Sequence, residues 1–436
     1  MKKTLPLLGL LCLLTFTSKG QFLDRLKNKV QRKVEDAVDK KVDNTIDNAG
    51  KKKDKSPSGT TPSSSGSGSD NPSSSGDVNV SATSQNTGPN LDIRSYSKFD
   101  FVPGAKVIVH EDFAQEAIGD FPAQWNTRTG AEVVTLSNRP GKWLALNKDG
   151  IFFPEYITSN LPENFTLQVD LMANDNIANI SNITIGLLHT KDVEEKFDMR
   201  TADYAPSGQG FKVGFTPVSS GHGSLYYSSN LIGQQHQGAI DEFNVPGKNT
   251  VTVSIWRQKQ RVRVYLDSTK ALDLPRALDA AAALNSLVFL AYAPDFDRKG
   301  GAFYVSNIRL AVGAPDTRNK LITEGKFITH GILFDVNSDK VQAASYGSLQ
   351  DIANVLKENA SVRVKIIGHT DADGEAQPNL DLSKRRAEAV KAALAQSFGI
   401  DAARMETDGK GETQPLDNNN TSAGKANNRR VEFVKL

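Results

Sequence analysis

Residues 56–76 constrain the fold more than any other stretch, because they contain only Ser, Gly, Pro, Thr, Asp and Asn. Such a segment has no apolar side chains to build a core, and Gly- and Ser-rich chain behaves as a flexible coil. We therefore expect a linker over residues 56–94, with separate structures before and after it. The 436 residues allow two or three domains, and the net charge of +2 argues against a dedicated nucleic-acid binder.

The first 20 residues have the pattern of an export signal. A basic start at Met1-Lys-Lys precedes a short apolar run, Leu5 to Phe16, and small residues follow at Ser18-Lys-Gly20. The run is too short to span a bilayer. We predict a signal peptide over 1–20. Cys12, the only cysteine, lies inside it and follows Leu11 rather than the small residue that a lipoprotein signal requires.

Residues 21–55 are predicted to form an amphipathic helix that carries eleven basic and seven acidic residues between 22 and 55. A spacing of four residues, against 3.6 per turn, makes the apolar stripe spiral around the helix, and a partner helix could follow it. A solvated helix and a membrane-surface helix remain alternatives. The apolar positions are Phe22, Leu26, Val30, Val34, Val38, Val42 and Ile46.

Residues 95–315 have the alternating pattern of short strands separated by Gly, Pro and Asn turns, which predicts an all-β jelly-roll sandwich. We expect Trp125, Trp143 and Trp256 to be core anchors. The stretch around Trp256 and the closing strand resemble concanavalin A-like and laminin-G-like β-sandwich domains. The predicted strands are Phe165–Leu171, Val251–Trp256, Arg261–Leu266, Ser286–Tyr292 and Ala302–Leu310.

Two alternatives to the sandwich fit the β region less well. A transmembrane barrel needs a continuous lipid-facing apolar side, whereas we expect Arg257, Arg261 and Arg263 to point outward. A jelly-roll glycosidase needs paired acids at alternate positions of one strand, and this region has no such run. His110-Glu-Asp is not the zinc-protease motif, because no second His follows it. We therefore predict a non-catalytic sandwich.

The C-terminal hundred residues alternate helices and strands, which predicts an α/β sandwich. One helix carries Leu349, Ile352 and Leu356 at helical spacing, and a second spans residues 379–397. Arg386 lies on the apolar stripe of the second helix, where an apolar residue would be expected. The predicted strands contain Val362, Val364 and Ile366, and then Val431, Phe433 and Leu436.

Motifs in this segment point to a ligand site. A Gly-His-Thr-Asp loop contains Thr370 and Asp371, and Arg386 follows in the second helix. One carboxylate can hold an ammonium group, and one guanidinium can hold a carboxylate through two parallel hydrogen bonds. This pair therefore suits a zwitterionic ligand. An ordinary surface ion pair is the simpler alternative.

These motifs, with Ile332-Leu-Phe-Asp335, Gly409-Lys-Gly-Glu412 and the ending Asn427-Asn-Arg-Arg-Val431, resemble the OmpA-like peptidoglycan-binding domain, here over residues 325–436. The resemblance implies that Asp371 and Arg386 clamp the diaminopimelate of uncrosslinked peptidoglycan stem peptides without covalent chemistry. It also implies binding roles for four other motif residues: Thr370, Asn379, Asn428 and Arg430.

No cofactor or metal is expected. Asp335-x-Asn337-x-Asp339 is similar to the start of a calcium loop but lacks its glycine and distant Glu.

The sequence thus predicts an exported, non-catalytic protein of the periplasm or outer-membrane-associated envelope of a Gram-negative bacterium. Peptidoglycan is its expected partner, and the sandwich is expected to contact a glycan or protein. The N-terminal helix could reach a further partner at the outer membrane. The alternatives are a lectin-like adhesin anchored to the cell wall and a glycan hydrolase with an unrecognised site.

Overall fold

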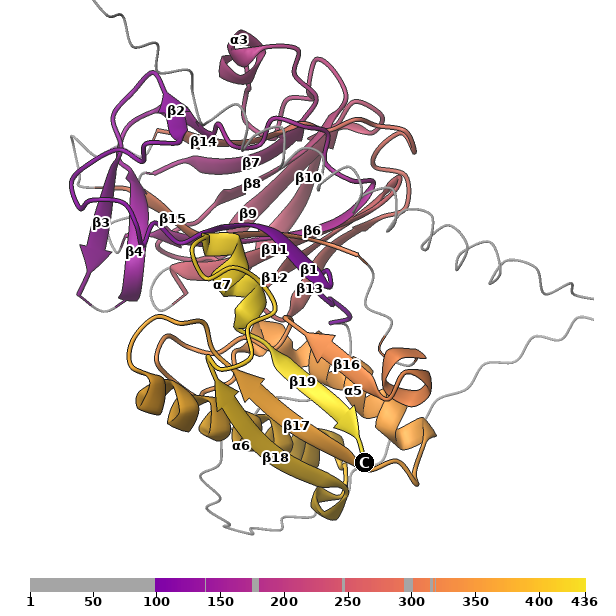
Figure 1. Ribbon diagram of the computed structural model, residues 1–436. Coiled ribbons are helices and arrows are strands. Elements are labelled where there is room, and N and C mark those ends of the chain that lie inside the picture. Colours follow the sequence, from indigo (N-terminus) through magenta and orange to yellow (C-terminus); the bar gives the residue numbers. More distant parts are fainter. Residues whose placement is uncertain are drawn as a thin grey trace, which may run out of the picture. The chain divides into compact units, whose positions relative to one another are not determined.

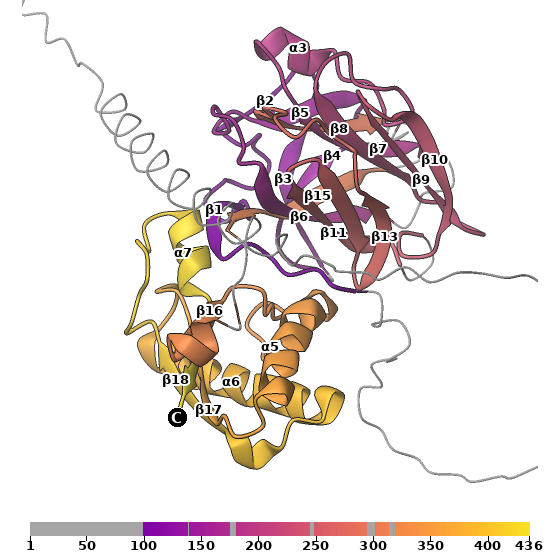
Figure 2. The same ribbon diagram turned by 90° about the vertical axis from the view of Figure 1, so that its right-hand side faces the viewer.

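The computed structural model describes residues 99–436 except 138, 175–179, 245–247, 294–300, 314–316 and 318. These described residues fall within a single compact unit that contains a β-sandwich followed by an α/β part (Figures 1 and 2). The predicted signal peptide, the helical segment 21–55 and the linker 56–94 lie outside the described residues.

The sandwich consists of two antiparallel sheets. The first has the strand order β13-β12-β11-β6-β15-β4-β3, with β1 paired to β15. Its strands are β1 (Lys106–Glu111), β3 (Glu132–Leu136), β4 (Arg139–Leu146), β6 (Asn164–Ala173), β11 (Thr250–Gln258), β12 (Arg261–Leu266), β13 (Thr269–Leu274) and β15 (Phe303–Val312).

The second sheet has the order β10-β9-β8-β7-β14-β5-β2. A short helix, α3 (Val193–Phe197), lies in the connection between β7 and β8. The strands are β2 (Trp125–Thr127), β5 (Gly150–Pro154), β7 (Asn182–Leu188), β8 (Gly210–Thr216), β9 (Gly223–Ser229), β10 (Gly233–Ile240) and β14 (Ser286–Tyr292).

Alternation along the strands creates the core between the sheets. Val251, Val253 and Ile255 of β11 face inward and join one large apolar cluster with residues from both sheets. Strand β7 is buried along its whole length, and Met199 packs over the outer face of the second sheet. The predicted sandwich is therefore confirmed, while its resemblance to concanavalin A-like domains stays a prediction.

The three tryptophans occupy different environments. Trp125 is buried in the inter-sheet cluster, as predicted. Trp143 is also buried but does not belong to that cluster. Trp256 is half-buried on the opposite face of β11, where it packs against the apolar cluster of the α/β part.

The prediction that Arg257 points outward is wrong. Arg257 shares the inward face of β11 with Val253 and Ile255, as strand alternation requires, and it is fully buried. Its guanidinium donates to the carbonyl oxygens of Ala282 (2.6 Å) and Lys259 (3.1 Å) at the end of the sheet. Burial lowers the pKa of Arg257 to about 10.

The α/β part has a sheet with the order β16-β19-β17-β18, in which β17 and β18 are parallel. Helices α5 and α6 lie on one face of this sheet (Figures 1 and 2). The elements are the π-helical turn Asn319–Thr323, β16 (Lys326–Thr329), the 3-10 turn Ala343–Ser345, α5 (Tyr346–Glu358), β17 (Val364–His369), α6 (Ala376–Phe398), the 3-10 turn Ala402–Arg404, β18 (Met405–Gly411), α7 (Ser422–Asn428) and β19 (Val431–Lys435).

Helix α6 confirms the helix predicted over 379–397 and extends it slightly at both ends. It ends at Gly399, whose φ of 68° places it in the left-handed region that favours glycine. Val390 and Leu394 of α6 pack with Ile352 of α5 and Ile366 of β17 in one core. This packing fixes α6 beside the loop that follows β17.

The sandwich and the α/β part share two sets of contacts. Phe101 and Tyr265 join the apolar cluster that contains α5, and a Cβ added to Gly347 would lie 1.9 Å from the Phe101 carbonyl oxygen. In the second set, the side-chain amide of Asn427 accepts from Val107 N–H and donates to Val107 C=O, both at 3.0 Å. Strand β1 and helix α7 are thereby joined.

Candidate functional site

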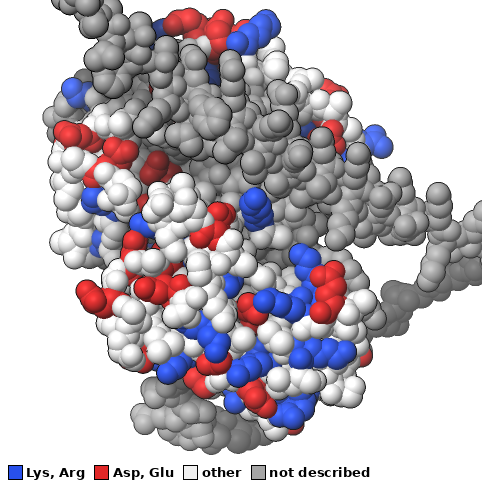
Figure 3. All heavy atoms as spheres, in the orientation of Figure 1, with Lys and Arg blue, Asp and Glu red and all other residues white. Residues whose placement is uncertain are grey.

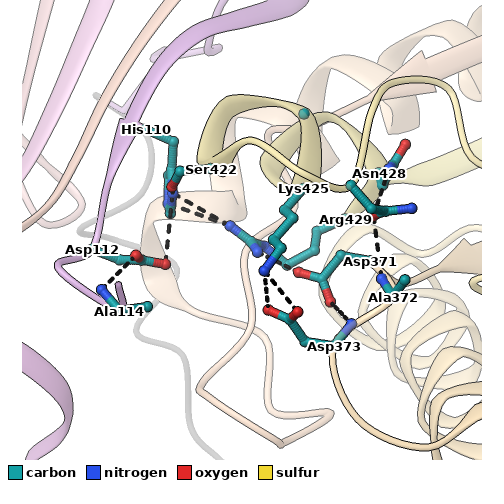
Figure 4. A network of polar contacts seen from close by, with 12 residues as sticks. His110, Asp112, Ala114, Asp371, Ala372, Asp373, Ser422, Lys425, Asn428 and Arg429 are labelled. Atoms are coloured by element: carbon teal, nitrogen blue, oxygen red, sulfur yellow. Dashed lines mark hydrogen bonds and ion pairs between the residues drawn. The ribbon is translucent and has the colours of Figure 1, made fainter. Parts of the chain in front are cut away.

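Asp371 lies in the loop between β17 and α6 and is 8% exposed. Its Oδ2 forms an ion pair with the guanidinium of Arg429, which follows α7 (Figure 4). Its Oδ1 accepts the backbone N–H of Asp373 at 3.2 Å. The predicted binding carboxylate is thus held in place by a cation and by its own loop.

Arg386 projects from α6 and is half-buried. Its Nε donates to the carbonyl oxygen of Ser338 (2.9 Å), and its guanidinium lies 4.9 Å from the centre of the Phe334 ring. No carboxylate of the described residues lies within 4 Å of it. Burial lowers the pKa of Arg386 to about 10, and the charge of Arg429 adds to this effect. A half-buried cation without a carboxylate partner carries a desolvation cost, which a bound anion would offset.

Asp371 and Arg386 therefore do not form an ion pair with each other. Arg429 is the cation bound to Asp371, and the sequence interpretation missed this role. Its motif contains two adjacent arginines, Arg429 and Arg430, and their spacing alone does not indicate which one reaches the loop. The charge of Asp371 still acts on Arg386 and opposes the lowering of its pKa. The two predicted residues thus share one electrostatic environment.

Asn379 and Thr370 support the loop. The Asn379 side chain donates to the carbonyl oxygen of Asp373 (3.0 Å) and to Glu412 Oε2 (2.7 Å). Thr370 donates its backbone N–H to Gly411 C=O at 3.0 Å. Its buried hydroxyl has no hydrogen-bond partner among the described residues. Asn379 positions the loop, and Thr370 leaves a hydroxyl near Asp371.

Asn428 is fully buried, and its side-chain amide forms hydrogen bonds with the segment that precedes α7. Its Oδ1 accepts the N–H groups of Leu416 (2.7 Å) and Asp417 (2.9 Å). Its Nδ2 donates to Asp417 C=O and to Asn419 Oδ1, both at 2.8 Å. Asn428 therefore has a structural role and offers no free amide to a ligand.

Arg430 is also buried, and it donates to the carbonyl oxygen of Gln414 at 2.9 Å. Its guanidinium lies 3.9 Å from Glu432 Oε2. Its Nε has no hydrogen-bond partner among the described residues. Arg430 therefore combines a structural contact with an unused donor.

A cavity of about 120 Å³ lies beside Arg386. Its lining residues include no carboxylate, so the cavity favours an anion. On the face of the α/β part in Figure 3, by contrast, basic and acidic side chains are interspersed. The basic and imidazole residues that line the cavity are Arg309, Arg386, Arg429, Arg430, His110, His330 and His369.

In the described part of the chain, no group of three or more His, Cys, Asp or Glu side chains is arranged to hold a metal ion. None of the described helices has the length and apolar character needed to cross a membrane.

Known proteins resemble the C-terminal part of the chain. Probable lipoprotein YiaD of Escherichia coli (strain K12) is 41% identical over 105 residues, which cover 24% of this chain and 48% of that protein. Outer membrane porin F of Pseudomonas aeruginosa is 38% identical over 101 residues, which cover 23% of this chain and 29% of the porin. The chain thus spans about half the length, or less, of these two curated relatives.

Among solved structures, the peptidoglycan-associated lipoprotein from Burkholderia pseudomallei is 31% identical to this chain. The match covers 28% of this chain and 100% of that one, with a TM-score of 0.24. The family model of the OmpA family matches residues 333–429. This segment contains the loop of Asp371, the helix of Arg386 and the ending around Arg429. Residues 333–429 of this chain are therefore an OmpA family domain.

Proposed function

We propose that the chain binds peptidoglycan non-covalently in the cell envelope of a Gram-negative bacterium, through Asp371 and Arg386. The observation that carries the proposal is the half-buried guanidinium of Arg386, which has no carboxylate partner among the described residues and lies in the same electrostatic environment as Asp371. The names of two relatives, an outer membrane porin of Pseudomonas aeruginosa and a probable lipoprotein of Escherichia coli, support the envelope location.

The chemistry suits an amino acid side chain that carries both an ammonium and a carboxylate, as diaminopimelate does. Arg386 uses its Nε for Ser338, so its two terminal nitrogens remain for a ligand carboxylate. The Asp371 carboxylate has about four acceptor sites, and Arg429 and Asp373 N–H use two of them. A ligand ammonium would take a third.

The test is co-sedimentation of the full chain with purified peptidoglycan of two kinds. One kind carries diaminopimelate in its stem peptides and the other carries lysine, which lacks the additional carboxylate. We expect sedimentation with the diaminopimelate type and weak sedimentation with the lysine type. Failure to sediment with either would overturn the proposal, and equal sedimentation would remove the role of Arg386 in recognising the carboxylate.

A second candidate function, glycan binding by the sandwich, has one specific observation in its favour. An open pocket of about 390 Å³ is lined by Asp203, Tyr204, Tyr226, Gln234 and Gln235. Tyr204 is 48% exposed, and the guanidinium of Arg200 lies 5.4 Å from the centre of its ring. Aromatic faces and polar side chains together suit the apolar faces and hydroxyl groups of a sugar.

The loop that carries Asp203 and Tyr204 is held by a buried lysine. Lys212 Nζ donates to the carbonyl oxygens of Arg200 (3.0 Å) and Thr201 (2.9 Å). Burial lowers the pKa of Lys212 to about 8. The pocket wall is therefore anchored from within the sheet.

A glycan array with the full chain tests this candidate. We expect Tyr204→Ala to remove any glycan signal. Tyr292→Ala changes a tyrosine that is similarly exposed (53%) and does not line the pocket, so it should preserve the signal. An array without any bound glycan, or a signal that survives Tyr204→Ala, would eliminate this candidate.

A further inference from the structure

The cavity beside Arg386 is built by both parts of the compact unit. The OmpA family domain supplies Arg386, and Arg429 and Arg430 follow its helix α7. The sandwich supplies His110 from β1 and Arg309 from β15, which face each other in the register of these two strands. Two strands of the sandwich thus form one wall of a cavity whose other wall carries the proposed ligand-binding arginine.

Arg309 is a buried cation of the sandwich that lines this cavity. It is 7% exposed, and its Nη1 donates a hydrogen bond of 3.2 Å to Gln168 Oε1. Among the described residues, no carboxylate lies within 4 Å of its guanidinium. Burial lowers the pKa of Arg309 to about 10, and the charge of Arg429 contributes. Packing a second uncompensated cation near Arg386 is unfavourable unless an anion joins them.

A β-bulge places Arg309 at this position. The pairing of β15 with β6 shifts between Ser306 and Arg309, and Asn307 has a φ of 48°. Bulges redirect side chains and are common next to binding sites. The irregularity therefore accounts locally for a cationic side chain at the cavity wall.

Four buried side-chain atoms of the lining residues have no hydrogen-bond partner among the described residues: Nδ1 of His330, Nδ1 and Nε2 of His369, and Nε of Arg430. Nε2 of His369 lies 3.4 Å from Glu432 Oε2, and the His369 side chain is fully buried. Buried polar atoms are paired in the large majority of cases, and each exception needs an explanation. At about 120 Å³, the cavity is several times larger than the ~10–15 Å³ that one water requires. A small polar group of a ligand would fit and could satisfy these atoms.

The sandwich wall is fixed to the OmpA family domain by polar contacts (Figure 4). His110 Nδ1 lies 3.0 Å from Ser422 Oγ, and Arg429 Nη2 lies 3.4 Å from His110 Nε2. Asn427 bonds both backbone groups of Val107. Arg429 also binds Asp371, so a single guanidinium connects the sandwich to the predicted loop.

We propose that the sandwich completes the ligand site of the OmpA family domain, with Arg309 binding a second carboxylate of the same stem peptide whose first carboxylate is bound by Arg386. This inference rests on the proposed function and adds a specificity-determining residue outside the family domain. Binding remains non-covalent. A stem peptide whose second carboxylate is amidated would lose the contact with Arg309 and would bind more weakly.

The test measures the affinity of the full chain for the tripeptide L-Ala–D-Glu–diaminopimelate, in its free form and with its C-terminal carboxylate amidated. We expect Arg309→Met to weaken binding of the free tripeptide roughly ten- to a hundredfold, the value of one charge-assisted contact. The same variant should bind the amidated tripeptide as the wild type does. Arg263→Met is the matched control on the same sheet, because Arg263 stacks on Trp256 and does not line the cavity.

The outcomes separate the two proposals. If Arg386→Met abolishes binding while Arg309→Met binds the free tripeptide like the wild type, the role of the sandwich is overturned and the proposed function stands. If neither variant changes binding, the proposed function fails as well. Arg309→Gln, which retains a polar contact to Gln168, replaces the Met variant if that variant loses its folded structure, and the same results are expected.

Discussion

Replacing Arg386 with methionine should separate ligand binding from folding. Methionine retains an unbranched, flexible side chain of similar reach but removes the charge. In the structure, Arg386 donates one hydrogen bond to Ser338 and lies over Phe334. Its neighbour Arg385 is exposed and lies 3.8 Å from Asp339, a surface ion pair. Arg385→Met is therefore a matched control in the same helix.

The expected change in stability follows from opposing contributions. Lowering the Arg386 pKa from 12.5 to about 10 means that the folded chain carries the charge at a cost of about 3 kcal/mol. The charged hydrogen bond to Ser338 stabilises the fold by about 1.5–3 kcal/mol, and the contact with the Phe334 ring stabilises it by a further ~0.5–2 kcal/mol. These values nearly cancel. We therefore expect the free energy of unfolding of Arg386→Met to lie within about 1–2 kcal/mol of the wild type, as for most single substitutions.

Binding should change far more than stability. Loss of a charge-assisted contact of about 1.5–3 kcal/mol weakens binding roughly ten- to a hundredfold. The assay combines urea unfolding with co-sedimentation on diaminopimelate-type peptidoglycan. Arg385→Met should match the wild type in both. The reasoning is refuted if Arg386→Met binds normally, or if it is destabilised by several kcal/mol, because its binding loss would then follow from unfolding.

Three other substitutions test the electrostatics and packing. Burial alone would raise the pKa of Glu432, but hydrogen bonds and charges from its basic neighbours lower it to about 2; its ionisation therefore stabilises the fold above pH ~4.5, and this contribution is lost as the pH falls toward 2. Glu432→Gln should lower the free energy of unfolding by about 3 kcal/mol at pH 7 and by progressively less below pH 4.5. A loss of stability that does not change with pH would contradict the lowered pKa of Glu432. Burial raises the pKa of Glu111 to about 7, so the stability of the fold decreases as the pH rises from ~4.5 through 7. In thermal unfolding, Glu111→Gln should be as stable as the wild type at pH 4 and more stable at pH 8. A variant that is no more stable than the wild type at pH 8 would refute this prediction. Gly347→Ala places a methyl group against the Phe101 carbonyl oxygen and should cost about 1–3 kcal/mol in urea unfolding; an unchanged midpoint would show that this contact is not closely packed.

Local patterns in the sequence predicted many of the elements. Strands β6, β11, β12, β14 and β15 and helix α6 lie where alternation or helical spacing placed them. Strand β7, which is buried along its whole length, was not among the predicted strands. The outward placement of Arg257 was wrong because its charge was given more weight than its register with Ile255.

The site was predictable only in part. Arg386 was identified from the motif that resembles the OmpA-like domain, and its position on an apolar helix face agreed with that assignment. The bond between Arg429 and Asp371 depends on how the end of α7 meets the loop after β17, and no local pattern encodes that meeting. The contribution of Arg309 requires the bulge in β15 and the contact between β1 and α7. Such contacts between distant segments arise only in the folded chain.

The most direct test of the central claim is a crystal structure of the full chain with the tripeptide L-Ala–D-Glu–diaminopimelate bound. The account predicts one ligand carboxylate within about 2.7–2.9 Å of the terminal nitrogens of Arg386, and the ligand ammonium at a similar distance from Asp371. A ligand bound elsewhere on the chain, with Arg386 still lacking a carboxylate partner, would contradict it.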